Sequence, residues 1–206
     1  MTTLYHQPRK CGCCGRKTTI LAVSSTNAFG CCDLDARPPE MRRSAMFYDV
    51  ELCDHCGYAA RNLEEPVTQS EELKKILSEK IDPADDVRRF ARAAEIAALK
   101  GQEKNKVNHL YLIAAWAADD KNDQETAAAL RKKILANLPK KGNFTPEQLL
   151  QLADIARRAG EKEAALDFLN RFGRYAAEPF LKRIAAYQLK LLARADTACH
   201  SVEELQ

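Results

Sequence analysis

Hydrophobic and polar residues follow two different patterns along this chain, and the change comes near residue 66. Before it, segments 18–25 and 45–52 are rich in β-branched or aromatic residues and alternate as strands do. After it, alanine, leucine, lysine, glutamate and arginine dominate, with apolar residues at helical spacing. We therefore expect an α+β protein, with a small β module in residues 1–66 and an all-helical domain in residues 67–206.

Capping signals divide the second part into seven expected helices. Thr68 opens a segment with capping-box spacing, whereas Asp82 and Thr145 each precede a proline suited to the first helical position. Gly101 and Gly160 are natural stops. The expected helices cover residues 68–81, 82–100, 104–120, 123–138, 145–159, 161–175 and 178–195.

Two of the helix pairs look alike. The segments Ala127-Ala-Ala-Leu130 and Glu163-Ala-Ala-Leu166 lie 36 residues apart, and each follows a short polar turn. A helix–turn–helix unit of about 34 residues is typical of tetratricopeptide repeats. The spacing predicts a short tetratricopeptide-like array, and a plain helical bundle is the alternative.

The cysteines are concentrated in the first part. Seven of the eight cysteines fall within the first 56 residues, and four of them form two C-x-x-C pairs, each followed by glycine. Two such knuckles make a tetrahedral four-thiolate site, which favours one structural zinc ion and a zinc-ribbon-like module. The predicted ligands are Cys11, Cys14, Cys53 and Cys56.

Other thiols near the knuckles leave the ligand set open. Cys13 adjoins Cys14, and Cys31-Cys32 lies in the loop between the knuckles, so one of these cysteines could replace a ligand or bind a second metal. They also permit a redox or metal-responsive switch. His55 lies between two predicted ligands and is expected to point to solvent or to donate to a neighbour rather than bind the metal.

The loop at residues 25–43 holds a second group of candidates. Asp33 and Asp35 stand two residues apart with Arg37 close behind, so they form a candidate interaction site. A cation site or an acid–base pair would use the same carboxylates. The alternative is that Asp35 and Arg37 fix the loop through a salt bridge or backbone capping.

Charge and hydropathy narrow the choice of partner. The formal net charge is +3 over 206 residues, and residues 1–66 contain eight basic and eight acidic side chains. A zinc ribbon that binds nucleic acid usually has a basic excess, so a nucleic-acid partner is disfavoured. No apolar run approaches the roughly 20 residues of a membrane span, and the N-terminus lacks signal-peptide character. We expect a cytoplasmic protein with no membrane partner.

Several motifs together resemble a known family. They are the two knuckles, the second of which continues as Gly57-Tyr-Ala59, the loop Ser25-Thr-Asn-Ala-Phe-Gly30 and its continuation to Met41, and Ala114-Ala-Trp116. In these motifs the chain resembles the bacterial domain-of-unknown-function family 2225, and Cys31-Cys32 departs from it. The resemblance implies a zinc module joined to tetratricopeptide-like helices, and it implies no activity.

The sequence shows no phosphate-binding glycine loop and no nucleophile with an accompanying base. We therefore expect a non-enzymatic, zinc-binding module that binds a protein or peptide, as an adaptor or scaffold does. Nucleic-acid binding through the ribbon, helped by Arg42-Arg43 and Arg131-Lys-Lys133, is one alternative, and the thiol switch is the other.

Overall fold

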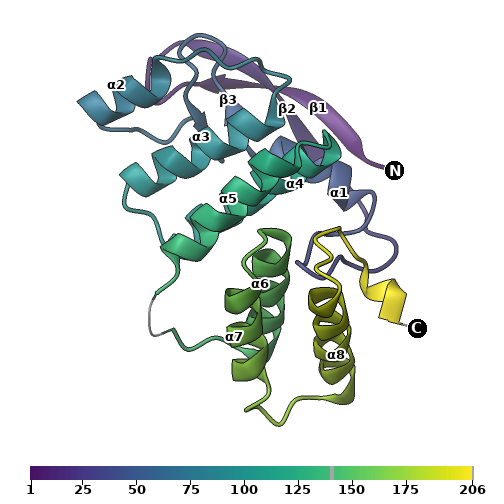
Figure 1. Ribbon diagram of the computed structural model, residues 1–206. Coiled ribbons are helices and arrows are strands. Elements are labelled where there is room, and N and C mark those ends of the chain that lie inside the picture. Colours follow the sequence, from purple (N-terminus) through teal and green to yellow (C-terminus); the bar gives the residue numbers. More distant parts are fainter. Residues whose placement is uncertain (140–141, 206) are drawn as a thin grey trace.

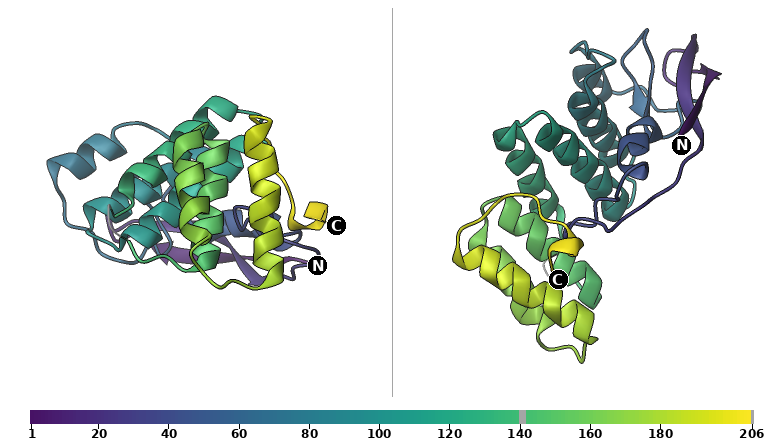
Figure 2. Two further views of the ribbon diagram at one scale, coloured as in Figure 1. Left: turned by 60° about the horizontal axis from the view of Figure 1, so that its bottom comes forward. Right: turned by 90° about the vertical axis from the view of Figure 1, so that its right-hand side faces the viewer.

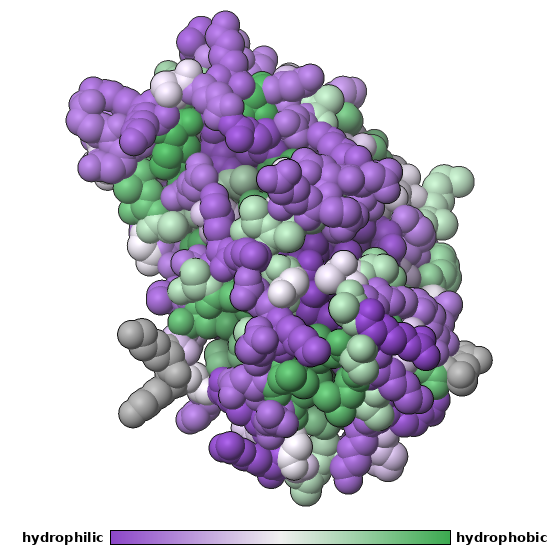
Figure 3. Space-filling model, viewed as in Figure 1, coloured by the Kyte–Doolittle hydropathy of each residue, from purple (hydrophilic) through white to green (hydrophobic). Residues whose placement is uncertain are grey.

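The computed structural model describes residues 1–139 and 142–205 and confirms the α+β class. A small N-terminal sheet is followed mainly by helices, with the hairpin and α6–α8 at opposite ends of the molecule (Figures 1 and 2). Polar side chains cover much of the face shown in Figure 3, and apolar side chains form smaller patches between them. None of the helices in the described part of the chain combines the length and the hydrophobicity that a membrane span needs.

A two-stranded antiparallel hairpin begins the chain. Strand β1 (Thr3–Lys10) pairs with β2 (Lys17–Ser25), from Lys10 opposite Lys17 at the turn to Thr3 opposite Ser25. The strand predicted at 18–25 is confirmed as β2. Thr18 and Ile20 are its buried residues, which accounts for the alternation in the sequence. β1 was not predicted, since most of its residues are exposed and its pattern carries little signal.

The strand predicted at residues 45–52 is wrong over most of its length. The helix α1 (Arg42–Ala45) and the 3₁₀ turn η1 (Met46–Asp49) occupy it, and only β3 (Glu51–Leu52) is extended. β3 pairs with β4 (Ala59–Ala60) across the second knuckle. The helical turn buries the adjacent Ala45 and Met46 on one side, whereas a strand would point them to opposite faces and would need cover on both.

All seven predicted helices are present. They are α2 (Glu71–Leu77), α3 (Asp86–Leu99), α4 (Lys104–Asp120), α5 (Gln124–Asn137), α6 (Pro146–Arg158), α7 (Lys162–Phe172) and α8 (Pro179–Ala193). The first two begin later than predicted, because Ser70 and Asp85 cap them instead of Thr68 and Asp82. Thr145 caps α6 as expected, and the capping box predicted at Thr68 is instead found here: Thr145 Oγ1 accepts from the Gln148 N–H at 3.3 Å, and Gln148 Oε1 accepts from the Thr145 N–H at 2.9 Å.

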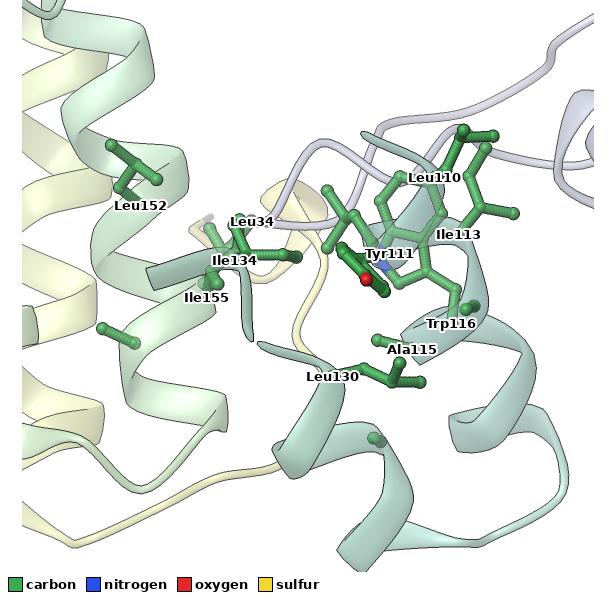
Figure 4. Close-up of a cluster of buried hydrophobic side chains, with 14 of the residues drawn as sticks. Leu34, Leu110, Tyr111, Ile113, Ala115, Trp116, Leu130, Ile134, Leu152 and Ile155 are labelled. Atoms are coloured by element: carbon green, nitrogen blue, oxygen red, sulfur yellow. The ribbon is translucent and has the colours of Figure 1, made fainter. Parts of the chain in front are cut away.

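Consecutive helices pack against one another in two groups. α3, α4 and α5 form the group beneath the hairpin, whereas α6 and α7 pack together with α8 beside them (Figures 1 and 2). The loop between β2 and α1 runs between the two groups. Its Leu34 is 5% exposed and lies beside Ile134 of α5 and Ile155 of α6 (Figure 4).

Two apolar clusters form the core, and each combines residues from both sides of position 66. The larger consists mostly of helical residues but includes Leu34, Met46, Val50 and Ala59. The smaller surrounds the knuckles and includes Leu73 of α2 and Ile96 of α3. Apolar packing is thus continuous across residues 66 and 67. The domain boundary expected there stays a prediction.

Candidate metal centre and the buried loop network

The four predicted ligands come together although they belong to two separate turns. Cys11 and Cys14 lie in the turn between β1 and β2, and Cys53 and Cys56 lie between β3 and β4. Their sulfur atoms all lie within 4.8 Å of one another. The Cys11–Cys56 and Cys14–Cys53 Sγ–Sγ distances are 3.7 and 3.8 Å. A tetrahedron with metal–sulfur bonds of about 2.3 Å has edges of about 3.8 Å, so the group fits a tetrahedral metal ion.

The two knuckles have the same backbone geometry. In each, the glycine N–H donates to the carbonyl of the first cysteine, at 2.8 Å from Gly15 to Cys11 and 2.9 Å from Gly57 to Cys53. Gly15 and Gly57 have φ values of 73° and 72°, in the left-handed region that side chains disfavour. This turn explains why glycine follows each pair and why both thiols of a pair point to one side.

A backbone contact joins the first knuckle to the segment after the second. The Gly12 N–H donates to the Leu63 carbonyl at 2.7 Å. A Cβ at Gly12 would lie 2.3 Å from the Glu65 carbonyl oxygen, so no larger residue fits without moving the backbone. The knuckles are therefore brought together by close packing as well as by their sulfur atoms.

The protein environment sets the protonation of the free thiols. Burial raises the pKa of Cys11 to about 11, and burial also raises the pKa of Cys56. At Cys14, the raising effect of burial is outweighed by a hydrogen bond from the Arg16 backbone and by the neighbouring thiols, which lower its pKa to about 7. A bound dication would favour the thiolate form of all four.

The remaining candidates near the knuckles lie outside this group. Cys13 is half-buried, and its carbonyl oxygen accepts from the side-chain amide of Gln69 at 3.1 Å. Cys31 and Cys32 are exposed in the loop. The His55 Nε2 lies 2.9 Å from the Lys17 carbonyl oxygen, which fits the expected contact to a neighbour.

The loop candidates are buried and bonded to helices. Asp35 is completely buried, and its Oδ2 accepts from Trp116 Nε1 at 2.8 Å and from Arg158 Nη1 at 2.7 Å. Arg131 Nη2 lies 3.5 Å from the same oxygen. Burial favours a raised pKa at Asp35, but the guanidinium groups of Arg158 and Arg131 together with Trp116 hold this pKa below its usual range. The carboxylate therefore stays charged.

Neighbouring charges extend this network. Asp119 at the end of α4 accepts from Arg131 at 2.6 Å and from Arg158 at 2.8 Å. Arg37 donates through both terminal nitrogens to Asp120, at 2.9 and 2.6 Å. Three carboxylates thus face three guanidinium groups where α4, α5, α6 and the loop meet.

Asp33 holds the C-terminal segment instead. It forms an ion pair with Arg43 at 2.6 Å and accepts from the Cys199 thiol at 3.2 Å. The backbone of Asp33 bridges Ser201, and the Val202 N–H donates to the Cys32 carbonyl at 3.0 Å. The C-terminal segment therefore packs on the loop through Ser201, Val202 and Glu203, and it ends in the 3₁₀ helix η2 (Val202–Leu205). The alternative role, in which the charged residues fix the loop, is thus favoured.

Sequence reasoning missed several residues of this network: Trp116 as a hydrogen-bond donor, Asp119, Asp120, Arg131 and Arg158. Asp35 is separated from Trp116 by 81 positions and from Arg158 by 123. No local pattern marks such a pairing. The only available signal was the unusual set of charged residues within otherwise apolar helical faces.

Two cavities lie near α4. One, of about 710 Å³, lies between the segment after the second knuckle and the adjoining ends of α3 and α4. The other, of about 220 Å³, is a groove open to solvent and lined by residues of α4, α5 and α6 and by Phe144. No family model, curated protein or solved structure compared with this chain matches it. The resemblance to family 2225 therefore rests on the motifs quoted above.

Proposed function

We propose that this chain is a zinc-stabilised, non-enzymatic module that binds a protein or peptide partner. The observation that supports it most is the closed geometry of the four cysteines. With four thiolates on one ion, no coordination position is left for a substrate or water, so the metal would have a structural role. Thiolate ligands in a tetrahedron favour zinc, and iron is the main competitor.

The binding surface proposed is the groove of the 220 Å³ cavity. It combines apolar side chains such as Leu112 and Ile134 with four side-chain amides. The amides belong to Asn105, Asn108, Gln148 and Gln151. Asn108, Gln148 and Gln151 each use one amide atom within the chain, for Asn137, Thr145 and the Asp35 carbonyl. The remaining amide atoms suit the unpaired backbone groups of an extended peptide, and the apolar lining suits its side chains.

The arrangement of the helices supports a tetratricopeptide-like interpretation of this groove. α4–α5 and α6–α7 are helical hairpins of similar length, and their turns contain Asn122 and Gly160 at φ values of 58° and 75°. Repeats of this type present one face to a partner. Under this proposal the chain also belongs with family 2225, whose motifs it carries.

The metal is tested by elemental analysis of the purified protein. We expect about one zinc per chain, and Cys14→Ser or Cys56→Ser should lower this content strongly. Cys13→Ser and Cys31→Ser are matched controls that should keep it. Zinc retained in the first pair of variants, or lost from the controls, would overturn the ligand set; iron in place of zinc would overturn the metal identity.

The groove is tested by site-specific photocrosslinking in the cells that produce the protein. A photoreactive side chain at the exposed Gln148 should give a discrete crosslinked partner, whereas the same group at the exposed Lys190 on α8 should not. A crosslink that disappears when the exposed Asn105 of the same groove is changed to Glu would support the groove. Absence of any crosslink specific to Gln148 would contradict it.

The nucleic-acid alternative has lost most of its expected contacts. Arg131 is 1% exposed and bound to Asp119. Arg42 pairs with Asp49, and Arg43 pairs with Asp33. Their carboxylate partners compete with phosphates for these arginines, whereas Lys132 and Lys133 stay on the exposed surface. The switch alternative has no support from proximity, because Cys13, Cys31 and Cys32 lie outside the metal-type cluster found among the described residues.

A further inference from the structure

Strand β1 has a free edge. It pairs with β2 on one side only, and no other backbone hydrogen bond among residues 1–139 and 142–205 reaches Leu4 or His6. The hairpin lies at one end of the molecule, away from α6–α8 (Figures 1 and 2). A strand of eight residues with an unpaired edge is able to pair with another extended strand.

Pro8 fixes which backbone groups face the free edge. It stands opposite Thr19 in the β1–β2 ladder. Because proline has no N–H, these two residues cannot exchange two hydrogen bonds, so they form a non-hydrogen-bonded pair. The two kinds of pair alternate along an antiparallel ladder, and the register is regular from Leu4 onwards. The backbone groups of Leu4, His6 and Pro8 therefore point away from β2.

Only one half of this edge carries residues that discourage pairing. Natural edge strands are often protected by proline and by basic side chains, and Pro8-Arg9-Lys10 supplies both next to the first knuckle. Residues 3–7 contain no proline and no acidic residue, lysine or arginine. Leu4 is 37% exposed and Tyr5 is 45% exposed. The half of β1 away from the knuckle is therefore open to pairing.

Exposed apolar side chains gather on the same hairpin. Nine large apolar residues are exposed in the described part of the chain, and four of them lie in or beside the two strands: Met1, Leu4, Tyr5 and Leu21. Leu4 and Leu21 share the face opposite to the buried Ile20, whereas Tyr5 lies on the face of Ile20. A two-stranded hairpin is marginally stable by itself, so additional strands would stabilise it.

The open half of β1 is complementary to a second copy of itself. With a two-fold axis at Tyr5, antiparallel pairing places Leu4 of one copy opposite His6 of the other. The backbone groups of both residues face the free edge, so each such pair exchanges both of its hydrogen bonds. The two Tyr5 side chains then lie directly opposite each other in a non-hydrogen-bonded pair, where side chains are closest.

Shifted registers fit less well on either side. An axis at His6 or at Gln7 would bring Pro8 opposite a residue whose carbonyl then receives no hydrogen bond. A shift in the other direction runs into the irregularity between Thr3 and Leu4. The axis at Tyr5 is therefore the register that the strand itself favours.

Charge also favours this occupant of the edge. In the antiparallel arrangement, Arg9 and Lys10 of the two copies lie at opposite ends of the paired segment. A parallel arrangement would place them side by side, and like charges in neighbouring strands are destabilising. Because residues 3–7 offer no charged partner, the edge suits an equally uncharged strand better than an acidic or a basic peptide.

We propose that two copies of this chain pair through β1 and form a four-stranded antiparallel sheet in the order β2–β1–β1–β2, with the two-fold axis at Tyr5. This interface lies on the hairpin, whereas the proposed peptide groove is lined by α4, α5 and α6. Dimerisation therefore does not require that the groove bind a peptide.

Sedimentation equilibrium of the zinc-loaded protein tests the pairing, at concentrations up to about 1 mM so that a small interface is detected. A reducing agent prevents the exposed Cys31 and Cys32 from joining copies. We expect a mass that rises from monomer to dimer. Tyr5→Lys should weaken dimerisation about tenfold, because it places two ammonium groups opposite each other. Phe180→Lys changes a similarly exposed aromatic residue of α8 and should have no effect.

His6→Pro provides a second variant with an independent cause. It removes an N–H that the β1–β2 ladder does not use, so the hairpin should fold whereas dimerisation should be lost. The melting curve and the zinc content of each variant check its folding. If one variant unfolds, the other still decides the question.

Hydrogen exchange locates the interface in the unmodified protein. Residues 3–7 should exchange more slowly at high protein concentration than at low concentration, whereas α8 should exchange equally at both. A monomer at every concentration would overturn the proposal. A dimer that survives both Tyr5→Lys and His6→Pro, or that leaves exchange in residues 3–7 unchanged, would overturn it as well.

Discussion

Asp35 shows how one side chain can determine the path of a whole loop. Its carboxylate contacts Trp116, Arg158 and Arg131, which belong to three different helices. A buried ion pair is not stabilising in itself, because both charges lose their hydration. Because the arginines are buried, however, removing the carboxylate that balances their charge should lower the stability of the fold strongly.

Asp35→Asn should lower the free energy of unfolding by about 3 kcal/mol, because it leaves buried guanidinium groups undercompensated while Asp119 still contacts them. Urea denaturation at pH 7 measures this. Asp167→Asn is the matched control: Asp167 is exposed and lies 3.9 Å from Arg171. That change should stay within about 0.5 kcal/mol. Equal effects of the two substitutions would contradict the role given to Asp35.

Asp35 should also make stability depend on acid. Arg158, Arg131 and Trp116 hold its folded-state pKa below the unfolded value of about 3.9, even though burial opposes this. The stabilisation is therefore present above about pH 4 and is lost as the pH falls through the folded pKa. Wild type should consequently lose more stability than Asp35→Asn between about pH 4 and pH 2, as measured by urea denaturation at each pH.

A second buried carboxyl acts with the opposite sign. Burial raises the pKa of Asp154 to about 6, and Arg157 offsets this only partly. Its folded form binds a proton more tightly than its unfolded form, so its contribution weakens as the pH rises from about 4 to 6. Below about pH 4 the contribution of Asp154 no longer changes, so a loss of stability in that range can be assigned to Asp35. Parallel curves for wild type and Asp35→Asn in that range would disprove the assignment.

At the scale of elements, the sequence predicts best those helices whose ends depend on residues close by in the chain. α4 was predicted with its observed bounds, Thr145 caps α6 as expected, and α5 begins next to Asp123, where its helix was predicted to start. Helix caps are encoded within four residues, so the sequence reveals the candidates, although Ser70 and Asp85 cap α2 and α3 in place of the residues predicted. β1 is different: with most of its residues exposed, it is held by pairing with β2 and by the knuckle that follows it.

Thr145→Ala should lower the free energy of unfolding by about 1 kcal/mol, since the capping box at α6 loses its hydroxyl acceptor. Glu178→Ala is a suitable control because Glu178 is the N-cap of α8 but makes no capping bond. It should change stability by only a few tenths of a kcal/mol. Thermal denaturation of both variants would test this difference, and an equal loss would show that the capping box contributes nothing.

At the scale of the whole molecule, the parts predicted from sequence are those whose residues are close together in the chain. The cysteine pairs and the helices are of this kind. The packing of the 25–43 loop between the helical groups is not, since Asp35 meets Arg158 across 123 positions. The contact between the C-terminal segment and Asp33 also joins residues far apart in the chain, so it has no local signature in the sequence.

The contrast between local and long-range contacts predicts which parts of the protein should unfold when the metal is removed. The four cysteines join the hairpin to the second knuckle, so chelation should unfold much of residues 1–66. Asp35 and Arg37 bind the helices through contacts that include no metal ligand. The middle of the loop should therefore stay attached, and the helical circular dichroism should be largely retained.

Hydrogen exchange with and without a chelator would locate the change. We expect rapid exchange in β1, β2 and both knuckles, with protection kept in α4 and α6. Cys14→Ser should give the same pattern without chelator, and Cys31→Ser should respond to chelator as wild type does. A parallel loss of protection in the hairpin and in all helices would contradict the two-part prediction. The apolar clusters shared across residue 66 would then make the chain a single cooperative unit, with zinc stabilising all of it.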